Sequence, residues 1–303
     1  MFNRCLRLYT ARRSVLRFAE GERAPEIPPV DAPGVHVWHD RRGGVVAWGF
    51  RHDGQYCMHW PSLATFRFSS DDPNITAFPA PRISLDFVWD TYRRSVLPMA
   101  LQALGWEALH ASAIVCRSGV VAFCAASETG KSTIAFALRR RGYPQWSDDG
   151  VVFRTERGVA VTIPLPFEVR LRRPSREIFA DAPLATRFQG NRCGDQVHVK
   201  PAPLSAICVL HRIEAAPGTA AVVEGVPRAD AFPMVLEHGH VFDPFDIGRR
   251  ARMIDTYLDV AEQVPVYRAH FAPDPNGLDL LLDDIVEGLG LPAPVPQTSL
   301  VAV

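Results

Sequence analysis

Short runs of apolar, aromatic and β-branched residues, separated by Gly, Asp and Pro, fill the first part of the chain. Four of these runs have the length and composition of β-strands, and they lie at 35–38, 45–50, 56–60 and 65–68. Proline-rich stretches at 25–33 and 73–81 interrupt the pattern. We therefore expect a small β-rich N-terminal module over residues 1–83.

From residue 84 onward the apolar residues recur at helical spacing. Ser84 stands in an N-cap position, the stripe continues towards Gly105, and Pro98 should kink or divide the helix. Trp89 and Tyr92 on this stripe could stack on an adenine base. Apolar stripes at helical spacing usually belong to a core, and we favour that interpretation here.

The middle of the chain combines a strand pattern with a helix pattern. Apolar runs at 114–116 and 120–124 flank a polar break, as in a β-hairpin. Residues 132–138 have helical spacing and are followed by three arginines and Gly142, which are helix-stop signals. A strand, a loop and a helix N-terminus in this order form the arrangement that binds anions.

The loop between these two elements carries a phosphate-binding motif. A Walker A loop runs G-x-x-x-x-G-K-[ST], and its backbone N–H groups surround the phosphates. The matching residues are Ala125, Ala126, Ser127, Glu128, Thr129, Gly130, Lys131, Ser132 and Thr133. Two residues depart from the motif, since Ala125 replaces the first glycine and Glu128 adds a negative charge. We predict that this loop binds ATP.

Lysine is rare in this chain. Lys131 and Lys200 are the two lysines, although Lys and Arg together number 33. A compact ammonium can reach the β- and γ-phosphates where a planar guanidinium would not fit. The retention of lysine at position 131 therefore supports the phosphate-loop interpretation, and Lys200 is a weaker candidate for a second phosphate contact.

Two adjacent carboxylates, Asp148 and Asp149, separate two short extended runs. In P-loop enzymes one carboxylate holds Mg²⁺ together with the Ser or Thr of the loop, and another can accept the proton of an attacking hydroxyl. An Asp-Asp-Gly turn that merely joins two strands is the alternative. Beside a phosphate loop we favour the chemical role.

Strand and helix patterns alternate again in the C-terminal half. Strands are expected at 206–210 and 264–271, and helices at 247–262 and 278–289. This alternation around a phosphate loop is typical of an α/β fold, which we assign to residues 84–290. The proline-containing tail, residues 291–303, is expected to be loose.

Composition limits the partners and the compartment. The formal net charge is +0 and no apolar run reaches the length of a membrane span, so we expect neither a nucleic-acid nor a membrane partner. The 6 cysteines lack C-x-x-C spacing, and two lie in apolar strands, which favours buried thiols in a reducing cytoplasm. The sequence does not decide whether the chain forms a homo-oligomer, which stays an open alternative.

His110 precedes the hairpin and completes a longer pattern. The order of His110, the Lys131 loop, a helix with a basic end, and the pair Asp148 and Asp149 resembles the catalytic domain of the HPr kinase/phosphorylase family. The resemblance covers about 109–153. The sequence segments around His110 and around the Asp pair are similar to those of diverged HPr-kinase-related proteins. These include the kinases of lasso-peptide clusters, which phosphorylate a serine of a precursor peptide.

The resemblance implies a mixed sheet flanked by helices and a kinase site that uses ATP and Mg²⁺. It implies that Lys131 contacts the phosphates, that Ser132 and Asp149 lie on the metal side, and that Asp148 is the base. His110 would lie near the transferred phosphate. The glycine-rich signature that serves phosphorolysis in true HPr kinases is missing from 163–174, so we expect neither HPr as substrate nor the reverse reaction.

Arg170 and Arg172 follow in an extended run and alternate onto one face of it. They could clamp a phosphate or an acidic substrate. Solvated surface arginines are an equally good interpretation.

The sequence therefore predicts an α/β kinase that transfers the γ-phosphate to a hydroxyl, with a serine of a peptide or protein as the expected acceptor. Two alternatives stay open. One is an ATP-binding regulatory or peptide-binding module without turnover, which Ala125 and Glu128 favour. The other is a kinase for a small-molecule hydroxyl.

Overall fold

The structure of the protein is a computed structural model. It describes residues 7–9, 17–20, 24–40, 42–72, 74–165, 167, 171, 173–179, 191–193, 196–198, 201–216, 218–274 and 276–294. The chain divides into two compact units. The first comprises Met1–Trp106, Gln189–Lys200 and Val241–Ile254, and the second comprises Glu107–Phe188, Pro201–His240 and Asp255–Val303.

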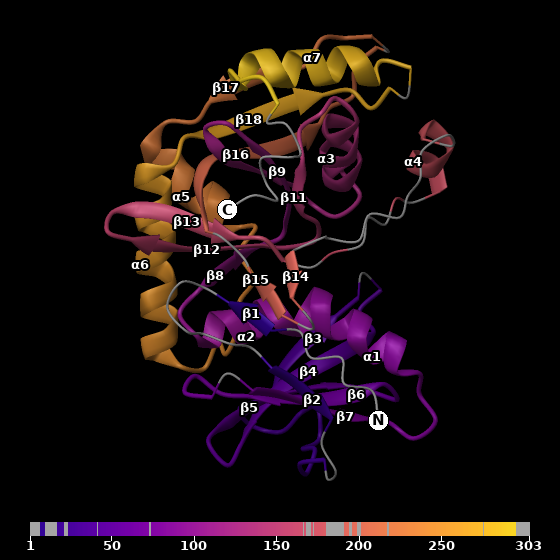
Figure 1. Ribbon diagram of the computed structural model, residues 1–303, viewed down its shortest axis with the longest axis vertical. Coiled ribbons are helices and arrows are strands. Elements are labelled where there is room, and N and C mark those ends of the chain that lie inside the picture. Colours follow the sequence, from indigo (N-terminus) through magenta and orange to yellow (C-terminus); the bar gives the residue numbers. More distant parts are fainter. Residues whose placement is uncertain are drawn as a thin grey trace. The chain divides into compact units, whose positions relative to one another are not determined.

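The first unit is built on a six-stranded sheet with the order β2-β7-β6-β5-β4-β3 (Figure 1). Its strands are β2 (Arg17–Glu20), β3 (His36–His39), β4 (Val45–His52), β5 (Gln55–Trp60), β6 (Ala64–Phe68) and β7 (Asn74–Pro79). Strands β3 to β7 form an antiparallel meander, and β2 pairs in parallel with β7. The four strands that the sequence predicted are confirmed, whereas β2 and β7 were not predicted. A second, three-stranded sheet joins β1 (Arg7–Tyr9), β15 (Gln196–His198) and β14 (Asn191–Cys193).

The predicted helix after Ser84 is present but divided. It consists of α1 (Leu85–Thr91), a π-helical turn η1 (Tyr92–Val96) and α2 (Leu97–Ala103). The Ser84 side chain accepts a hydrogen bond from the Asp86 amide at 3.3 Å, which confirms the N-cap. Pro98 lies in the first turn of α2, where its missing N–H costs little, and the irregular turn precedes it. Tyr92 is fully buried, so the apolar stripe belongs to the core.

The second unit contains a mixed sheet of nine strands with the order β11-β9-β10-β16-β13-β12-β8, extended by β18 and β17 (Figure 1). Its strands are β8 (Glu107–Leu109), β9 (Ala111–Cys116), β10 (Gly119–Cys124), β11 (Gln145–Ser147), β12 (Val151–Glu156), β13 (Val159–Ile163), β16 (Ala202–Arg212), β17 (Val222–Gly225) and β18 (Val266–Phe271). Strand β16 runs parallel to β10 and β18, and its other neighbour, β13, is antiparallel. The same edge of β16 pairs first with β13 and then with β18, so the sheet divides there.

Helices cover this sheet, as expected for an α/β unit. They are α3 (Lys131–Arg140), α4 (Arg173–Ile178), α5 (Arg228–Leu236) and α7 (Leu278–Gly288), while α6 (Ile247–Gln263) begins in the first unit and continues into the second. Buried side chains of α3, β10, β16 and α7 share one core, which includes Phe136, Phe123, Leu210 and Leu282. Burial of a side chain of this size contributes about 1.5–3 kcal/mol to folding. The predicted helices at α3, α6 and α7 are confirmed.

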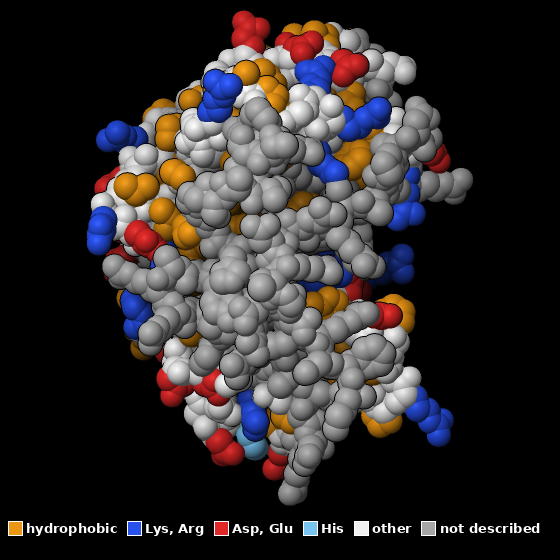
Figure 2. Space-filling view, viewed as in Figure 1, with side chains coloured by type: hydrophobic (Ala, Val, Ile, Leu, Met, Phe, Trp, Pro, Cys, Tyr) orange, Lys and Arg blue, Asp and Glu red, His pale blue; other side chains and the backbone are white. Residues whose placement is uncertain are grey.

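Charged side chains of both signs are interspersed over α7 (Figure 2). Arg141, just after α3, donates to Asp283 at 2.6 Å and to Asp279 at 2.9 Å. These exposed pairs connect the end of α3 to α7, although pairs at a surface contribute little stability. Among the described residues, no helix combines the length and the apolar character that a membrane crossing needs.

Four of the described cysteines are buried and form no disulfide, namely Cys57, Cys116, Cys124 and Cys208. Burial raises the pKa of the Cys124 thiol to about 12. Such a thiol stays protonated and behaves as a small apolar side chain. This agrees with the expectation of buried thiols.

Candidate functional site

The loop that follows β10 leads directly into α3. Strand β10 is buried along its whole length, and Ala125 after it is still part of the apolar core. Gly130, the N-cap of α3, has φ 121°, a conformation that residues with a Cβ rarely adopt. The loop therefore turns sharply from the carboxyl end of a central strand into the N-terminus of a helix. That end of a helix carries partial positive charge and favours anions.

Lys131 is the first residue of α3, and its side chain is buried. Its Nζ donates to the carbonyl oxygens of Ala125 at 2.9 Å and Ala126 at 3.3 Å. The ammonium group is thus held inside the loop rather than in solvent. The other predicted loop residues surround it: Ala126, Ser127 and Glu128 are exposed, whereas Thr129, Gly130, Ser132 and Thr133 are half-buried.

Glu128 departs from the usual motif and also has an unusual backbone conformation. Its φ is 73°, in the left-handed region, and the residue is exposed. A residue with a Cβ pays roughly 1–2 kcal/mol for this conformation, and glycine does not.

Ser132, Asp148 and Ser112 form a compact group of oxygen atoms beside Lys131. The Ser132 hydroxyl donates to Asp148 Oδ1 at 2.8 Å, and the Ser112 hydroxyl donates to the same oxygen at 2.6 Å. Strand β11 brings Asp148 to this position because it pairs with β9, the strand that carries Ser112. Burial raises the pKa of Asp148, while the bonds from the two serines oppose the shift.

Asp149 has an unusual backbone conformation and contacts His110 through its carbonyl group. Its φ is 67°, and its carbonyl oxygen lies 3.3 Å from Nδ1 of His110. Burial and the charge of Lys131 lower the pKa of His110, so the imidazole is neutral near pH 7. A ring that donates from Nδ1 keeps an unprotonated Nε2, which can accept a proton or a hydrogen bond.

Three polar contributors to this site were missed by sequence reasoning. Ser112 lies two residues after His110, and the period of two along a strand could have linked them. His240 belongs to a His-Gly-His sequence, and its ring lies 5.7 Å from the His110 ring, edge to face. Arg212, at the end of β16, donates from Nε to the Thr129 carbonyl at 2.9 Å. Nothing local in the sequence distinguishes Arg212 from the other arginines.

The remaining predicted site residues cannot be placed beside this group. Arg170, Arg172 and Lys200 lie outside the described residues. All of the placed site residues belong to the second compact unit.

A magnesium ion bound with phosphates suits this arrangement. Within the described part of the chain, no three His, Cys, Asp or Glu side chains gather to hold a metal. Mg²⁺ in nucleotide sites needs only one or two carboxylates, because phosphates and waters complete its octahedron. The Ser132 hydroxyl and the Asp148 carboxylate supply protein oxygens of that kind.

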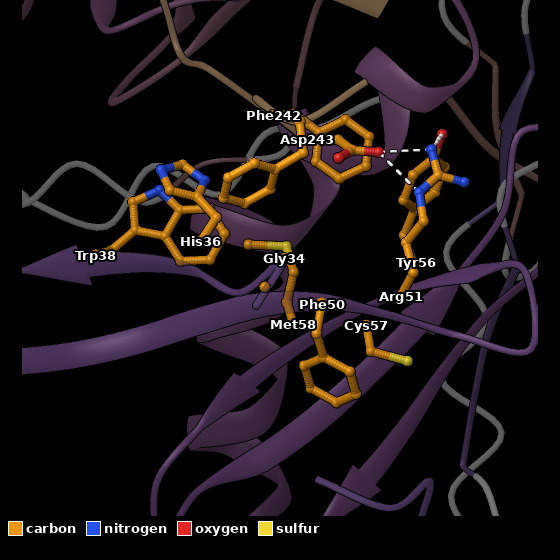
Figure 3. A pocket seen from close by; sticks show the side chains of 12 residues that line it. Gly34, His36, Trp38, Phe50, Arg51, Tyr56, Cys57, Met58, Phe242 and Asp243 are labelled. Carbon is orange, nitrogen blue, oxygen red and sulfur yellow. Dashed lines mark hydrogen bonds and ion pairs between the residues drawn. The ribbon is translucent and has the colours of Figure 1, made fainter. Parts of the chain in front are cut away.

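The first unit contains a small hollow of a different character, of about 20 Å³. Figure 3 shows His36 and Trp38 at one side of it and Arg51, Tyr56 and Asp243 at the other. The Arg51 guanidinium donates to Asp243 Oδ2 at 2.6 Å and stacks 4.2 Å from the centre of the Tyr56 ring. Its charged groups therefore satisfy one another.

No protein-family model and no curated protein matches the chain. Among solved structures, an Hpr(Ser) kinase/phosphatase from Coxiella burnetii is similar in part, with 12% sequence identity and a TM-score of 0.32. The match covers 59% of this chain and 94% of the other chain. Because a similarity this weak establishes neither fold nor function, we base the proposed function on the contacts of the site.

Proposed function

We propose that the protein is an ATP- and Mg²⁺-dependent phosphotransferase that moves the γ-phosphoryl group to a hydroxyl. One observation carries this proposal. Ser132 directly follows the loop lysine, and its hydroxyl lies 2.8 Å from Oδ1 of Asp148, which is 16 residues further along the sequence. A chance G-K-S-T turn would have no reason to bring a carboxylate to this serine.

The contacts favour a specific division of labour. Lys131 would bind the β- and γ-phosphates, and the backbone of the loop would surround them. Ser132 and Asp148 would hold Mg²⁺, which neutralises charge on the phosphates when bound. The resemblance to HPr kinases led us to expect Asp149 on the metal side and Asp148 as base. We propose the reverse, because Asp148 already binds the hydroxyl that the metal would use.

Asp149 is then the candidate base. In the proposed step the acceptor oxygen bonds to the γ-phosphorus, the bond from that phosphorus to the β–γ bridging oxygen breaks, and ADP leaves. The proton of the acceptor hydroxyl passes to the Asp149 carboxylate. His110, held by the Asp149 carbonyl at 3.3 Å, presents its other ring nitrogen for a contact to the transferred group. Catalysis would come from positioning and charge neutralisation.

We propose a serine of a peptide or protein as the acceptor. The resemblance to the HPr-kinase-related proteins around His110 and Asp148 supports this choice. A small-molecule hydroxyl would meet the same chemical requirements at the site. The buried, free thiols are consistent with a reducing cytoplasmic location, which we propose on that ground.

A second candidate is an ATP-binding, peptide-recognising module without turnover. The aromatic hollow of the first unit favours it, because His36, Trp38 and Tyr56 are side chains that suit a peptide. The negative charge at Glu128 also favours weak or idle nucleotide binding.

Incubation with γ-labelled ATP, Mg²⁺ and a library of serine-containing peptides separates the candidates. The enzyme should transfer label to peptide. In Asp148→Asn, Mg²⁺ should no longer tighten the binding of ATP. Asp149→Asn should keep ATP binding, but its rate of phosphoryl transfer should fall about 10²–10⁴-fold. ATP binding without transfer to any peptide, to small hydroxyl compounds or to water would support the idle module instead.

A further inference from the structure

The His-Gly-His segment, residues 238–240, is fixed against strand β8. The His110 amide donates to the His238 carbonyl at 2.7 Å, and the His240 amide donates to the Ala108 carbonyl at 2.8 Å. Between them Leu109 and Gly239 form an antiparallel bridge. In this register His110 lies opposite His238, and the ring of His240 reaches to 5.7 Å from the ring of His110.

Gly239 is required for this approach. A Cβ at this position would lie 2.7 Å from the Tyr257 hydroxyl oxygen and 3.0 Å from the Leu236 carbonyl oxygen. The Tyr257 hydroxyl in turn donates to the Ala108 carbonyl at 2.7 Å. The segment is therefore held from both sides, and its two histidines have little freedom to move.

The rings of His110 and His240 both lie near Asp149. His110 Nδ1 lies 3.3 Å from the Asp149 carbonyl oxygen, and the His240 ring lies 5.7 Å from the His110 ring, near enough to Asp149 for that residue to raise its pKa against the effect of burial. A carbonyl oxygen has two lone pairs and can accept two N–H donors. Burial, and to a smaller extent the neighbouring His110, lowers the pKa of His240 to about 4, so the ring is neutral near pH 7.

Asp149 needs such support. Its φ of 67° is uncommon for a residue with a side chain, and conformations of this kind persist where the surroundings fix them. Asp148 before it is held by two serine hydroxyls, and Gly150 after it is buried. The contact from the His110 imidazole, with the His240 ring packed against it, supports the peptide between these points, and with it the direction of the Asp149 carboxylate.

We propose that His240 is a positioning residue of the phosphotransfer site: through the Asp149 backbone and the His110 ring, it holds both groups in the orientation that phosphoryl transfer requires. This role rests on the proposed function. Packing alone does not account for a histidine here, because burying an imidazole is costly unless its polar atoms are bonded. Phenylalanine would fill a similar space without that cost.

The test compares His240→Phe with His240→Gln, using steady-state kinetics with ATP, Mg²⁺ and the best serine peptide of the library. Phenylalanine keeps the ring and removes the N–H donor, whereas glutamine keeps a donor. We expect His240→Phe to lower kcat about 10–100-fold, the usual effect of losing a supporting hydrogen bond around a reactive group, with KM for ATP within about twofold. His240→Gln should recover at least part of the loss.

His270→Phe is the matched control. His270 lies on β18, its ring stacks on that of His211 at 5.4 Å, and it has no assigned role in the reaction. Its replacement should leave kcat unchanged, and thermal unfolding of every variant checks folding.

Three outcomes would overturn the role. In the first, a folded His240→Phe variant keeps the wild-type kcat while the wild-type protein transfers phosphate. In the second, both variants lose activity only in proportion to a lower Tm, which is a structural effect. In the third, the wild-type protein transfers no phosphate, and the proposed function then fails together with the role of His240.

Discussion

The phosphate loop of the second unit and the aromatic hollow of the first unit use their charged groups in opposite ways. In the hollow, Arg51 is bonded to Asp243, Asp246 and Tyr56, so its charge is neutralised within the protein. At the loop, the ammonium of Lys131 donates to the carbonyl oxygens of Ala125 and Ala126, and the Asp148 carboxylate accepts from the hydroxyls of Ser132 and Ser112. A cation that is held by carbonyls can exchange them for phosphate oxygens at low cost. A cation in a completed ion pair exchanges its partners less readily, and for this reason we propose the loop, and not the hollow, as the reactive site.

Among the substitutions that test the difference between the loop and the hollow, Lys131→Met is expected to lower the rate of phosphoryl transfer the most. Methionine keeps the apolar stem of the side chain but removes the charge that would meet the phosphates. We expect phosphoryl transfer to fall about 10²–10³-fold, the effect of removing one group that stabilises charge in a transition state. Initial rates with γ-labelled ATP measure it. Retention of the wild-type rate would show that the loop is not the phosphate site.

Acidification should destabilise the second unit through its partly buried histidines, His240 above all. His240 has a pKa of about 4 in the folded protein, mainly because of burial, against an ordinary value of 6.5. The unfolded chain therefore binds this proton first, so the contribution of His240 to stability is complete above pH 6.5 and is lost as the pH falls to about 4. The expected loss is about 3 kcal/mol in the free energy of unfolding.

Urea unfolding at a series of pH values measures this loss. His240→Gln should flatten the acid limb of the profile, whereas His270→Gln should leave it nearly as in the wild type. An unchanged acid limb in His240→Gln would contradict the assigned burial of the neutral ring.

The charged cluster of the hollow should matter for stability and not for activity. Asp243→Asn keeps a residue that tolerates the left-handed backbone at φ 47°, but it removes the charge that pairs with Arg51. Because Arg51 is partly exposed, we expect a loss of only about 1 kcal/mol in stability. Thermal unfolding measures it, and kcat for phosphoryl transfer should stay unchanged. A large fall in kcat with an unchanged Tm would place the hollow in the reaction.

Glu128→Gly is expected to have the smallest effect, and in the opposite direction. Glycine accepts the φ of 73° without strain, and the substitution removes a negative charge from the proposed phosphate-binding loop. We expect ATP to bind about two- to fivefold more tightly, since an exposed charge is screened by salt. Titration calorimetry at low and high salt measures it. Weaker binding by this variant would mean that Glu128 assists the nucleotide.

Local patterns were sufficient to predict the loop and its two flanking elements. The hairpin of β9 and β10 and the helix α3 follow from residues that are neighbours in sequence, and Lys131 and Ser132 lie within them. Helix α5 was not predicted, because Pro233 lies inside it and its apolar spacing is weak. The tertiary partners of the site were also beyond reach. Ser112 meets Asp148 only because β11 pairs with β9, and His240 meets His110 only because residues 238–240 pair with β8.

The central claim is that Ser132 and Asp148, beside Lys131, hold Mg²⁺ with ATP. Titration calorimetry of ATP with and without Mg²⁺, on the wild-type protein and on Asp148→Asn, tests it most directly. Mg²⁺ should tighten ATP binding to the wild-type protein by about tenfold or more, the effect of one charge-assisted metal contact, and Asp148→Asn should abolish this tightening. Equal tightening in both proteins, or no ATP binding to the wild-type protein with Mg²⁺ present, would contradict it.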